Sequence, residues 1–231
     1  MQTMGTGNVP LSLLRVIANI QNSSPPELKS EQISMHLTQP QSQQALAYVW
    51  LIFGIYWFAS ALRTKTAKTT EFPGWRILRL LILFFTFALL FAPWMRIGFL
   101  GARFVPIKPV LFQAGFFAAI AGITLALWAR LHLGRNWSDK VVLKVNHELV
   151  RSGPYAYFRH PIYSGVLLGV LGTGLVVGEW RGILAFCLLL VNYSIKAKKE
   201  EQILAAQFGD AFVQHQKQAG FLLPKFGRRV H

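Results

Sequence analysis

The chain is 231 residues long; 53% of its residues are hydrophobic and only 14% are charged. Soluble domains carry about 25% charged residues, so this composition argues against an ordinary water-soluble globule and a disordered chain. The formal net charge of +15 suggests anionic lipid headgroups as the simplest partner of so apolar a chain, and not nucleic acid. The single cysteine, Cys187, excludes a disulfide framework and a Cys-x-x-Cys metal site.

The first 44 residues are polar and rich in Gln, Ser and Pro. They lack the basic flank, apolar run and cleavage site of a signal peptide. We therefore expect a polar N-terminal tail over residues 1–44, with one short amphipathic helix near residues 11–20.

Apolar runs follow, and each is long enough to form a helix that crosses a membrane or nearly does so, since about 20 helical residues span the hydrocarbon core. The last two runs are short and are joined by only residues 178–181, which predicts a tight antiparallel hairpin. A buried soluble hairpin is the alternative for this pair. The sequence thus predicts an all-α integral membrane protein with about five transmembrane helices. The predicted runs are residues 45–62, 77–95, 110–131, 162–177 and 182–195.

Most of the 24 Lys and Arg residues flank the ends of these runs on one side. They follow the first run, follow the third run and fill the C-terminal tail. Because basic residues are enriched in cytoplasmic loops, we expect the segment between the third and fourth runs and the C-terminus to be cytoplasmic. The N-terminal tail is then expected outside.

Glycines recur in the fourth run, with the small-xxx-small spacings Gly165–Gly169 and Gly174–Gly178. Such spacings favour close helix packing in lipid. The alternative is that the missing side chains leave room for a ligand on this face.

Polar chemistry concentrates in residues 133–163 and 196–226, which flank the predicted hairpin. Gly153 and Pro154 predict a turn, and Pro161 suits the first turn of a helix. His160 and Tyr163 then lie at the mouth of the fourth run. Lys196 and Glu200 share one helix face. Taken singly, these residues can be interfacial anchors or an exposed ion pair, but the hairpin brings both segments to one side.

Other functional templates are absent from the sequence. His147 and His160 lack metal-ligand spacing, so no metal is expected. There is no zinc-binding His-Glu-x-x-His, nucleophile elbow, P-loop or Rossmann glycine motif. A nucleotide-like cofactor would therefore bind outside a Rossmann fold.

Several motifs in residues 133–226 carry a resemblance, and they cover roughly 40% of the chain. In order and spacing they resemble the isoprenylcysteine carboxyl methyltransferase family and its prokaryotic relatives. Phospholipid methyltransferases and membrane sterol reductases look similar in this region. The motifs are residues 134–138 (GRNWS), 147–155 (HELVRSGPY), 159–163 (RHPIY), 200–201 (EE), 208–212 (FGDAF) and 220–224 (GFLLP).

The resemblance implies a membrane enzyme that binds S-adenosyl-L-methionine. It also implies that residues 132–231 form a catalytic region, with a cofactor-binding loop, the helical hairpin and a cytoplasmic C-terminal helix, behind three transmembrane helices in residues 45–131. Lys196 stands where the family has a substrate-facing arginine, and Lys lacks the bidentate fork that suits a carboxylate. Lys196 and Glu200 are the implied catalytic residues. The implied cofactor-binding residues are His147, Glu148, Leu149, Val150, Tyr155, His160, Pro161, Ile162, Tyr163 and Glu200.

The identity of the acceptor stays open at this point. A carboxylate needs no base, whereas an amine must lose a proton, for which Glu200, Glu201 and His160 are the candidates. An NADPH-dependent reductase, with Lys140, Lys144 and Arg151 at the ribose phosphate, and a non-enzymatic scaffold are the alternatives. We expect a lipophilic substrate, contact with membrane lipids, no nucleic acid and no obligate protein partner. The plasma (inner) membrane, with the catalytic face in the cytoplasm, is the expected location.

Overall fold

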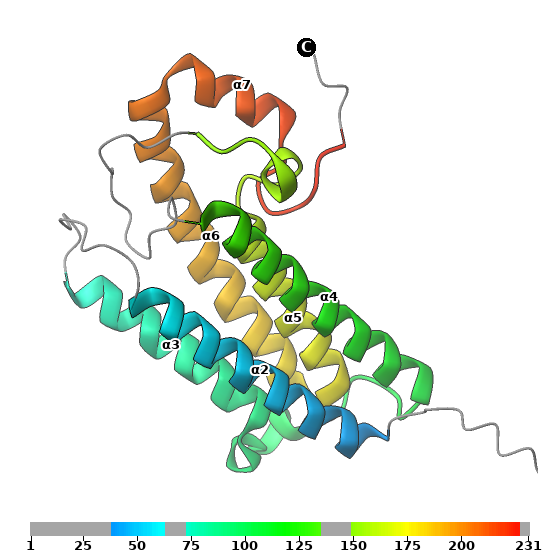
Figure 1. Cartoon of the computed structure of the whole chain (residues 1–231). Helices are drawn as coiled ribbons and strands as arrows, with labels where there is room; N and C mark the ends of the chain where they lie inside the picture. Colours follow the sequence, from blue (N-terminus) through cyan, green and yellow to red (C-terminus); the bar gives the residue numbers. More distant parts are fainter. Residues whose placement is uncertain (1–37, 63–72, 135–148, 227–231) are drawn as a thin grey trace, which may run out of the picture. The chain divides into compact units, whose positions relative to one another are not determined.

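The computed structural model describes residues 38–62, 73–134 and 149–226. The chain divides into Met1–His36 and Leu37–His231, and every described residue lies in the second part. The helix expected near residues 11–20 falls outside the described residues. Within the described ranges the regular structure is helical (Figure 1), with two isolated β-bridges and no strand. The α-helices are α2 (Gln39–Leu62), α3 (Pro73–Phe91), α4 (Pro109–Leu133), α5 (Pro161–Val177), α6 (Trp180–Phe208) and α7 (Asp210–Gln218).

Three helices in the described part are long and apolar enough to cross a membrane: α3 over Gly74–Phe91, α4 and α6. Helix α5 is apolar but shorter, with 17 residues. Only 17% of the α3 span is buried inside the protein, so most of its apolar surface is available to lipid. The predicted all-α integral membrane architecture is confirmed, whereas the exact number of spans stays a prediction.

Two helix boundaries differ from the apolar runs. Helix α3 ends at Phe91, before the predicted end at residue 95, because Pro93 cannot continue the helix and holds Ala92 in an extended conformation. Helix α2 starts at Gln39, inside the stretch predicted as a tail. Its first turn is capped by Gln41, whose Oε1 accepts hydrogen bonds from the backbone N and the Oγ1 of Thr38 at 2.9 and 3.0 Å.

The predicted hairpin of α5 and α6 has the expected tight turn. Gly178 ends α5 with a φ of +70°, a left-handed conformation that favours glycine, and its N donates to the Gly174 carbonyl at 2.8 Å. The two helices approach closely at Gly174 and Gly182. A Cβ on Gly182 would lie 2.9 Å from the Gly174 Cα, which leaves no room for a side chain there, and a Cβ on Gly174 would lie only 3.2 Å from the Gly182 carbonyl oxygen.

The glycine face of α5 packs against α4, as the first interpretation of the spacing predicts. A Cβ on Gly165 would lie 2.6 Å from the backbone N of Ala126 and the carbonyl oxygen of Gly122, both in α4. Trp50 of α2 covers Gly169, and its Nε1 donates to Thr173 Oγ1 at 3.0 Å. The space left by the missing side chains is therefore filled by protein.

A buried ion-pair cluster fixes the turn end of the hairpin to α3. Glu179, only 3% exposed, accepts a hydrogen bond from Arg181 Nε at 2.6 Å and pairs with Arg96 Nη2 at 2.9 Å. Arg181 Nη1 also donates to the carbonyl oxygens of Leu89 and Ala92, at 2.8 and 3.0 Å. The first bond satisfies the Leu89 carbonyl in the last turn of α3, which has no partner in its own helix, and the second ties Arg181 to the residue directly after α3.

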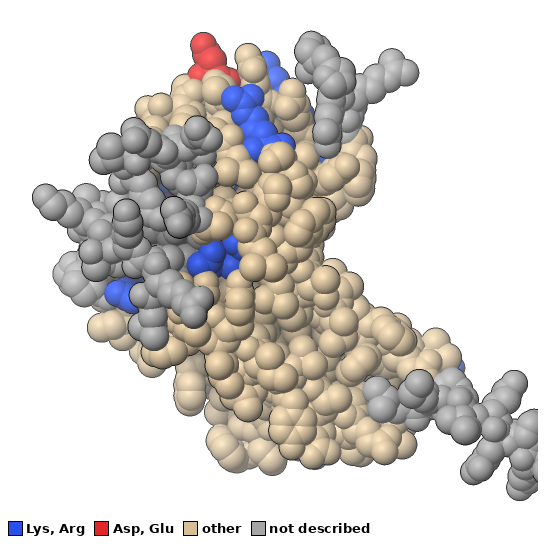
Figure 2. Space-filling model, in the orientation of Figure 1, with Lys and Arg blue, Asp and Glu red and all other residues tan. Residues whose placement is uncertain are grey.

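Helix α6 is continuous for 29 residues, so it carries both the apolar run at residues 182–195 and the charged stretch that starts at Lys196. Gly209, with a φ of +49°, ends α6 and allows α7 to begin at Asp210. In Figure 2 the charged atoms gather around the end of the molecule that carries α7, while the helices below present an almost uncharged surface. The polar residues of interest lie at this charged end.

Candidate active site

The site starts in the segment that leads into α5. A short 3-10 helix, Gly153–Ala156, begins with Gly153 at a φ of +58° and Pro154. Pro161 then occupies the first turn of α5, where its missing N–H needs no partner. The chain after α7 lies alongside this segment, because Arg159 N donates to the Gly220 carbonyl at 2.7 Å and Gly220 N donates to the Tyr157 carbonyl at 3.0 Å.

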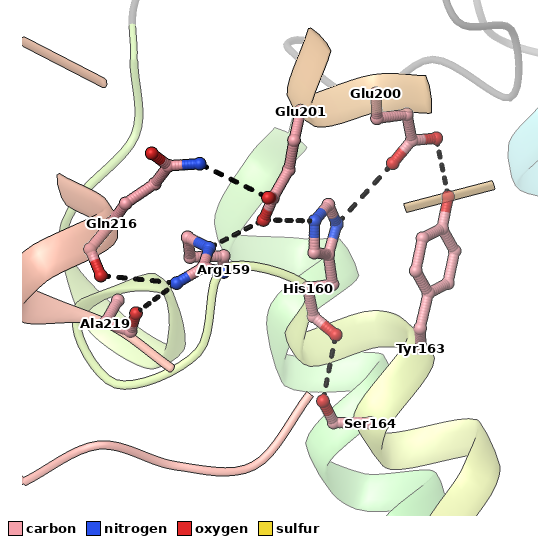
Figure 3. A network of polar contacts seen from close by, with 8 residues as sticks. All are labelled: Arg159, His160, Tyr163, Ser164, Glu200, Glu201, Gln216 and Ala219. Carbon is pink, nitrogen blue, oxygen red and sulfur yellow. Dashed lines mark hydrogen bonds and ion pairs between the residues drawn. The ribbon is translucent and has the colours of Figure 1, made fainter. Parts of the chain in front are cut away.

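His160, the residue before α5, is 7% exposed and faces two carboxylates of α6. Its Nδ1 lies 3.6 Å from Glu200 Oε2, and its Nε2 lies 3.2 Å from Glu201 Oε1 (Figure 3). Burial alone would lower the pKa of His160, but its hydrogen bonds with Glu200 and Glu201 and their negative charges outweigh burial and raise it. The imidazole therefore favours its protonated form.

Glu200 links α6 to the first turn of α5. Its Oε1 accepts a hydrogen bond from the Tyr163 hydroxyl at 2.6 Å, and Lys196 Nζ lies 4.0 Å from the same oxygen. The Lys196 ammonium also lies 5.4 Å from the centre of the Tyr163 ring, and the Tyr193 ring is 4.7 Å from that ring. The structure thus brings together Lys196, Glu200, His160 and Tyr163, as the sequence predicts.

The remaining predicted cofactor residues lie partly in a small apolar cluster. Val150, Tyr155, Ile162 and Tyr163 pack around Ala129 of α4. The Tyr155 hydroxyl reaches the Ala129 carbonyl at 3.5 Å; burial, and next the charge of Glu200, raise the pKa of Tyr155. Pro161 is fully buried, and Leu149 precedes Val150 with a partly exposed side chain. His147 and Glu148 lie outside the described residues.

Three residues join this site that the sequence interpretation did not select. Arg159 Nε donates to Glu201 Oε1 at 2.6 Å, and Gln216 Nε2 donates to Glu201 Oε2 at 3.3 Å. Tyr193 packs on Tyr163. Arg159 directly precedes His160 in the matched motif, which is a usable signal, but Gln216 and Tyr193 have no motif or spacing that points to them.

This arrangement suits a cationic ligand with an apolar portion. Carboxylates that lie beside aromatic rings can hold an ammonium or sulfonium group, and their attraction is stronger where water is scarce. Among the described residues, no group of three His, Cys, Asp or Glu side chains is arranged to hold a metal ion.

Comparisons with known proteins agree with the motifs. Residues 114–206 match the profile of the isoprenylcysteine carboxyl methyltransferase (ICMT) family. The matched range begins 19 residues before the motif stretch of residues 133–226 and ends 20 residues before that stretch ends. Residues 208–212 and 220–224 therefore lie outside the match. It includes every residue of the site that precedes residue 207.

Curated relatives are similar to part of this chain. A protein-S-isoprenylcysteine O-methyltransferase of Schizosaccharomyces pombe is 36% identical over 99 residues, which is 42% of each chain. The cobalt-zinc-cadmium resistance protein CzcN of Cupriavidus metallidurans is 29% identical over 122 residues, 52% of this chain and 51% of that protein. The chain therefore spans about half the length, or less, of these relatives.

A solved structure of the eukaryotic intramembrane Ras methyltransferase ICMT, without a monobody, aligns with 67% of this chain and 53% of its own. The sequence identity is 25% and the TM-score is 0.45. The family match over residues 114–206 and the curated relatives confirm the predicted resemblance to the isoprenylcysteine carboxyl methyltransferase family and its prokaryotic relatives.

Proposed function

We propose that this chain is a membrane S-adenosylmethionine-dependent methyltransferase that acts on a lipophilic acceptor. The observation that carries the proposal is the position of Glu200. Its carboxylate meets Tyr163, His160 and Lys196 at one end of the apolar helices, within the region that matches the ICMT family. The named relative from Schizosaccharomyces pombe is a protein-S-isoprenylcysteine O-methyltransferase, which supports this reaction class.

The residues present fit such a cofactor. S-adenosylmethionine supplies an activated methyl group on a sulfonium, so the protein has little covalent chemistry to perform beyond orientation. We assign Glu200 to a cationic group of the cofactor, and His160 and Tyr163 to holding Glu200 in place. Val150, Tyr155, Pro161 and Ile162 would contact the apolar portions. His147, Glu148 and Leu149 complete the proposed set.

For the acceptor, Lys196 is the proposed orienting residue. The Lys196 side chain is 14% exposed, and its ammonium is held near Glu200. It can therefore contact an anionic group that approaches the site. A single ammonium orients a carboxylate less firmly than the guanidinium fork of arginine does. A carboxylate acceptor needs only this orientation and partial loss of its water, because it attacks without first losing a proton.

An amine acceptor fits the same site less well. His160 faces both Glu200 and Glu201, and their contacts raise its pKa despite its burial, which favours the protonated form that is unable to act as a base. Glu201 already receives hydrogen bonds from Arg159 and Gln216. These contacts engage His160 and Glu201, two of the three candidate bases, and so favour an acceptor with a carboxylate over one with an amine. For the NADPH alternative, Lys140 and Lys144 lie outside the described residues.

We place the enzyme in the plasma (inner) membrane with the α7 end in the cytoplasm. The excess of basic residues after the first run, after the third run and in the C-terminal tail of the sequence supports the orientation. The acceptor would enter sideways from the bilayer, where an amphiphile already lies with its polar group at headgroup depth.

The test is calorimetric titration of detergent-purified protein with S-adenosylhomocysteine, comparing wild type with Glu200→Ala. Saturable binding that is lost in Glu200→Ala is expected, because the variant removes the proposed anionic partner of the cofactor. Gln202→Ala is the matched control, since Gln202 is an exposed residue two positions further along α6.

Well-folded wild type that binds no S-adenosylhomocysteine would contradict the proposal. NADPH is then the next ligand to titrate, and its binding would select the reductase. Full cellular function after Glu200→Ala and His160→Ala would instead select the non-enzymatic scaffold.

A further inference from the structure

Glu201 follows Glu200 in α6, yet it contacts a different set of groups. Its Oε1 accepts from Arg159 Nε at 2.6 Å and lies 3.2 Å from His160 Nε2. Its Oε2 accepts from Gln216 Nε2 at 3.3 Å. Both oxygens are therefore occupied by protein groups, and the side chain is only 15% exposed. A carboxylate so fully engaged suits an orienting role better than contact with a ligand.

Arg159 ties this carboxylate to the end of α7. While its Nε holds Glu201, its Nη1 donates to the carbonyl oxygens of Gln216 and Ala219, at 3.3 and 2.7 Å (Figure 3). The planar guanidinium has several donors in a fixed geometry, so it can hold the carboxylate and the backbone at once. Gln216 adds a second link, since its side chain holds Glu201 and its carbonyl accepts from Arg159.

His160 stands between Glu201 and Glu200. A neutral imidazole carries a proton on only one ring nitrogen, so the imidazolium is the form in which both nitrogens present a proton to a carboxylate. The ring is further confined by Tyr163, stacked at 5.6 Å, and by the edge of Phe221 at 5.4 Å. The titratable and charged groups around it are Glu200 and Glu201 of α6, the neighbouring Arg159, His215 of α7 and Tyr163 of α5.

We propose that Glu201 is a positioning residue, which Arg159 and Gln216 hold so that it fixes the His160 imidazolium against Glu200. The packing of α7 thereby helps to hold the Glu200 carboxylate, the proposed cofactor ligand, in one orientation. This inference rests on the proposed function, because Glu200 is the proposed cofactor ligand. It adds Arg159, Glu201 and Gln216 as residues that act through His160 and touch neither cofactor nor acceptor.

The first readout needs no cofactor. Protein labelled with ¹⁵N-histidine is titrated by NMR, and the His160 signals are assigned by their loss in His160→Asn. Removing one of the two carboxylates that favour the imidazolium should shift the His160 midpoint to lower pH in Glu201→Gln. Gln216→Ala should shift it in the same direction by a smaller amount. Gln218→Ala, an exposed position of the same helix, is the matched control and should leave the midpoint unchanged.

The second readout is the affinity for S-adenosylhomocysteine. Glu201→Gln should weaken it about fivefold at neutral pH, the worth of one hydrogen bond. The loss should grow on the alkaline side, where His160 gives up its proton first in the variant. Glu201→Asp, which keeps the charge, should recover part of the affinity.

The inference is overturned if Glu201→Gln leaves the His160 midpoint and the affinity at their wild-type values. Should Glu201→Gln fail to fold, Gln216→Ala decides, and an unchanged midpoint in that variant overturns the inference. A folded wild type that does not bind S-adenosylhomocysteine would contradict the proposed function instead. The cofactor-free titration would then still decide the role of Glu201.

Discussion

The Tyr163 hydroxyl lies 2.6 Å from Glu200 Oε1 and joins the first turn of α5 to the charged stretch of α6. A helical hairpin with a two-residue turn makes this contact possible, because it brings the start of one helix beside the far part of the other. The hydroxyl occupies one oxygen of Glu200 and His160 faces the other. The orientation of this carboxylate is therefore set by His160 and Tyr163, which lie three residues apart at the start of α5.

Tyr163→Phe tests the hydroxyl while it keeps the ring packing. Hydrogen bonds to charged groups contribute about 1.5–3 kcal/mol, so we expect the Kd for S-adenosylhomocysteine to rise at least about tenfold. Calorimetry on the detergent-purified variant gives the Kd. Tyr48→Phe removes a hydroxyl from a side chain that is 58% exposed on α2, and it should leave the Kd unchanged. Equal effects of the two substitutions would contradict the role of Tyr163.

Lys196→Ala separates binding of the acceptor from binding of the cofactor. If Lys196 orients a carboxylate, its loss should raise the KM for an isoprenylcysteine acceptor about tenfold, since an ionic hydrogen bond is lost, and should change cofactor affinity much less. Steady-state kinetics and calorimetry measure the two effects. Lys196→Arg should retain a low KM because arginine binds a carboxylate with two donors.

Lys198→Ala is the control for the charge of this helix, because Lys198 is exposed two positions further along α6. It should leave the KM near the wild-type value. Losses of equal size in KM and in cofactor affinity after Lys196→Ala would contradict the division of roles between Lys196 and Glu200.

The sequence predicts the helices of this protein well because apolar runs report directly on burial in lipid. It also predicts the hairpin turn at Gly178, since only a few residues connect the two runs. The helix ends are less predictable. Polar residues 39–44 form the start of α2 because tertiary contacts hold them, and Gln39 Nε2 donates to the carbonyl oxygens of Val176 and Val177 at 3.0 and 3.1 Å.

The site also contains residues that the sequence could locate and residues that it could not. Helix periodicity places Lys196 and Glu200 on one face, and Pro161 places His160 and Tyr163 at the start of α5, but the resemblance to the family is what selects these residues as site candidates. Gln216 could not be found, because its contact with Glu201 depends on how α7 folds back after Gly209. Sequence neighbours also do not share a role automatically. Glu200 and Glu201 are adjacent, yet one faces Tyr163 and Lys196 while the other faces Arg159 and Gln216.

The buried histidine His215 should make the folded protein less stable in mild acid. It is 3% exposed, and burial, aided by the charges of Arg151, Arg159 and His160, lowers its pKa to about 4. The unfolded chain takes up a proton near pH 6.5, so the folded state is penalised as the pH falls from about 6.5 towards about 4. The stability lost in this window is up to about 3 kcal/mol. His160, with its pKa raised, acts in the opposite direction, because the folded state takes up this proton before the unfolded chain does; its contribution is the same in wild type and in His215→Gln, so it cancels in the comparison of their slopes.

The measurement is the Tm of wild type and His215→Gln in detergent between pH 7 and pH 5. The wild-type Tm should fall more steeply than that of the variant, because Gln cannot take up a proton. His132→Gln, a substitution at an exposed histidine, should keep the wild-type slope. Parallel slopes for wild type and His215→Gln would contradict the assignment.

Gly165→Ala tests whether the glycine face of α5 serves packing. The new Cβ would lie 2.6 Å from the Ala126 backbone N and the Gly122 carbonyl oxygen, and neither backbone atom can move without displacing α4. Overpacking of this kind costs about 1–3 kcal/mol, so the Tm should fall by several degrees. Gly54→Ala is the matched control, because a Cβ on Gly54 of α2 meets nothing within 4 Å and alanine favours the helix. Its Tm should be unchanged or higher, and an equal fall in both variants would contradict the packing role of Gly165.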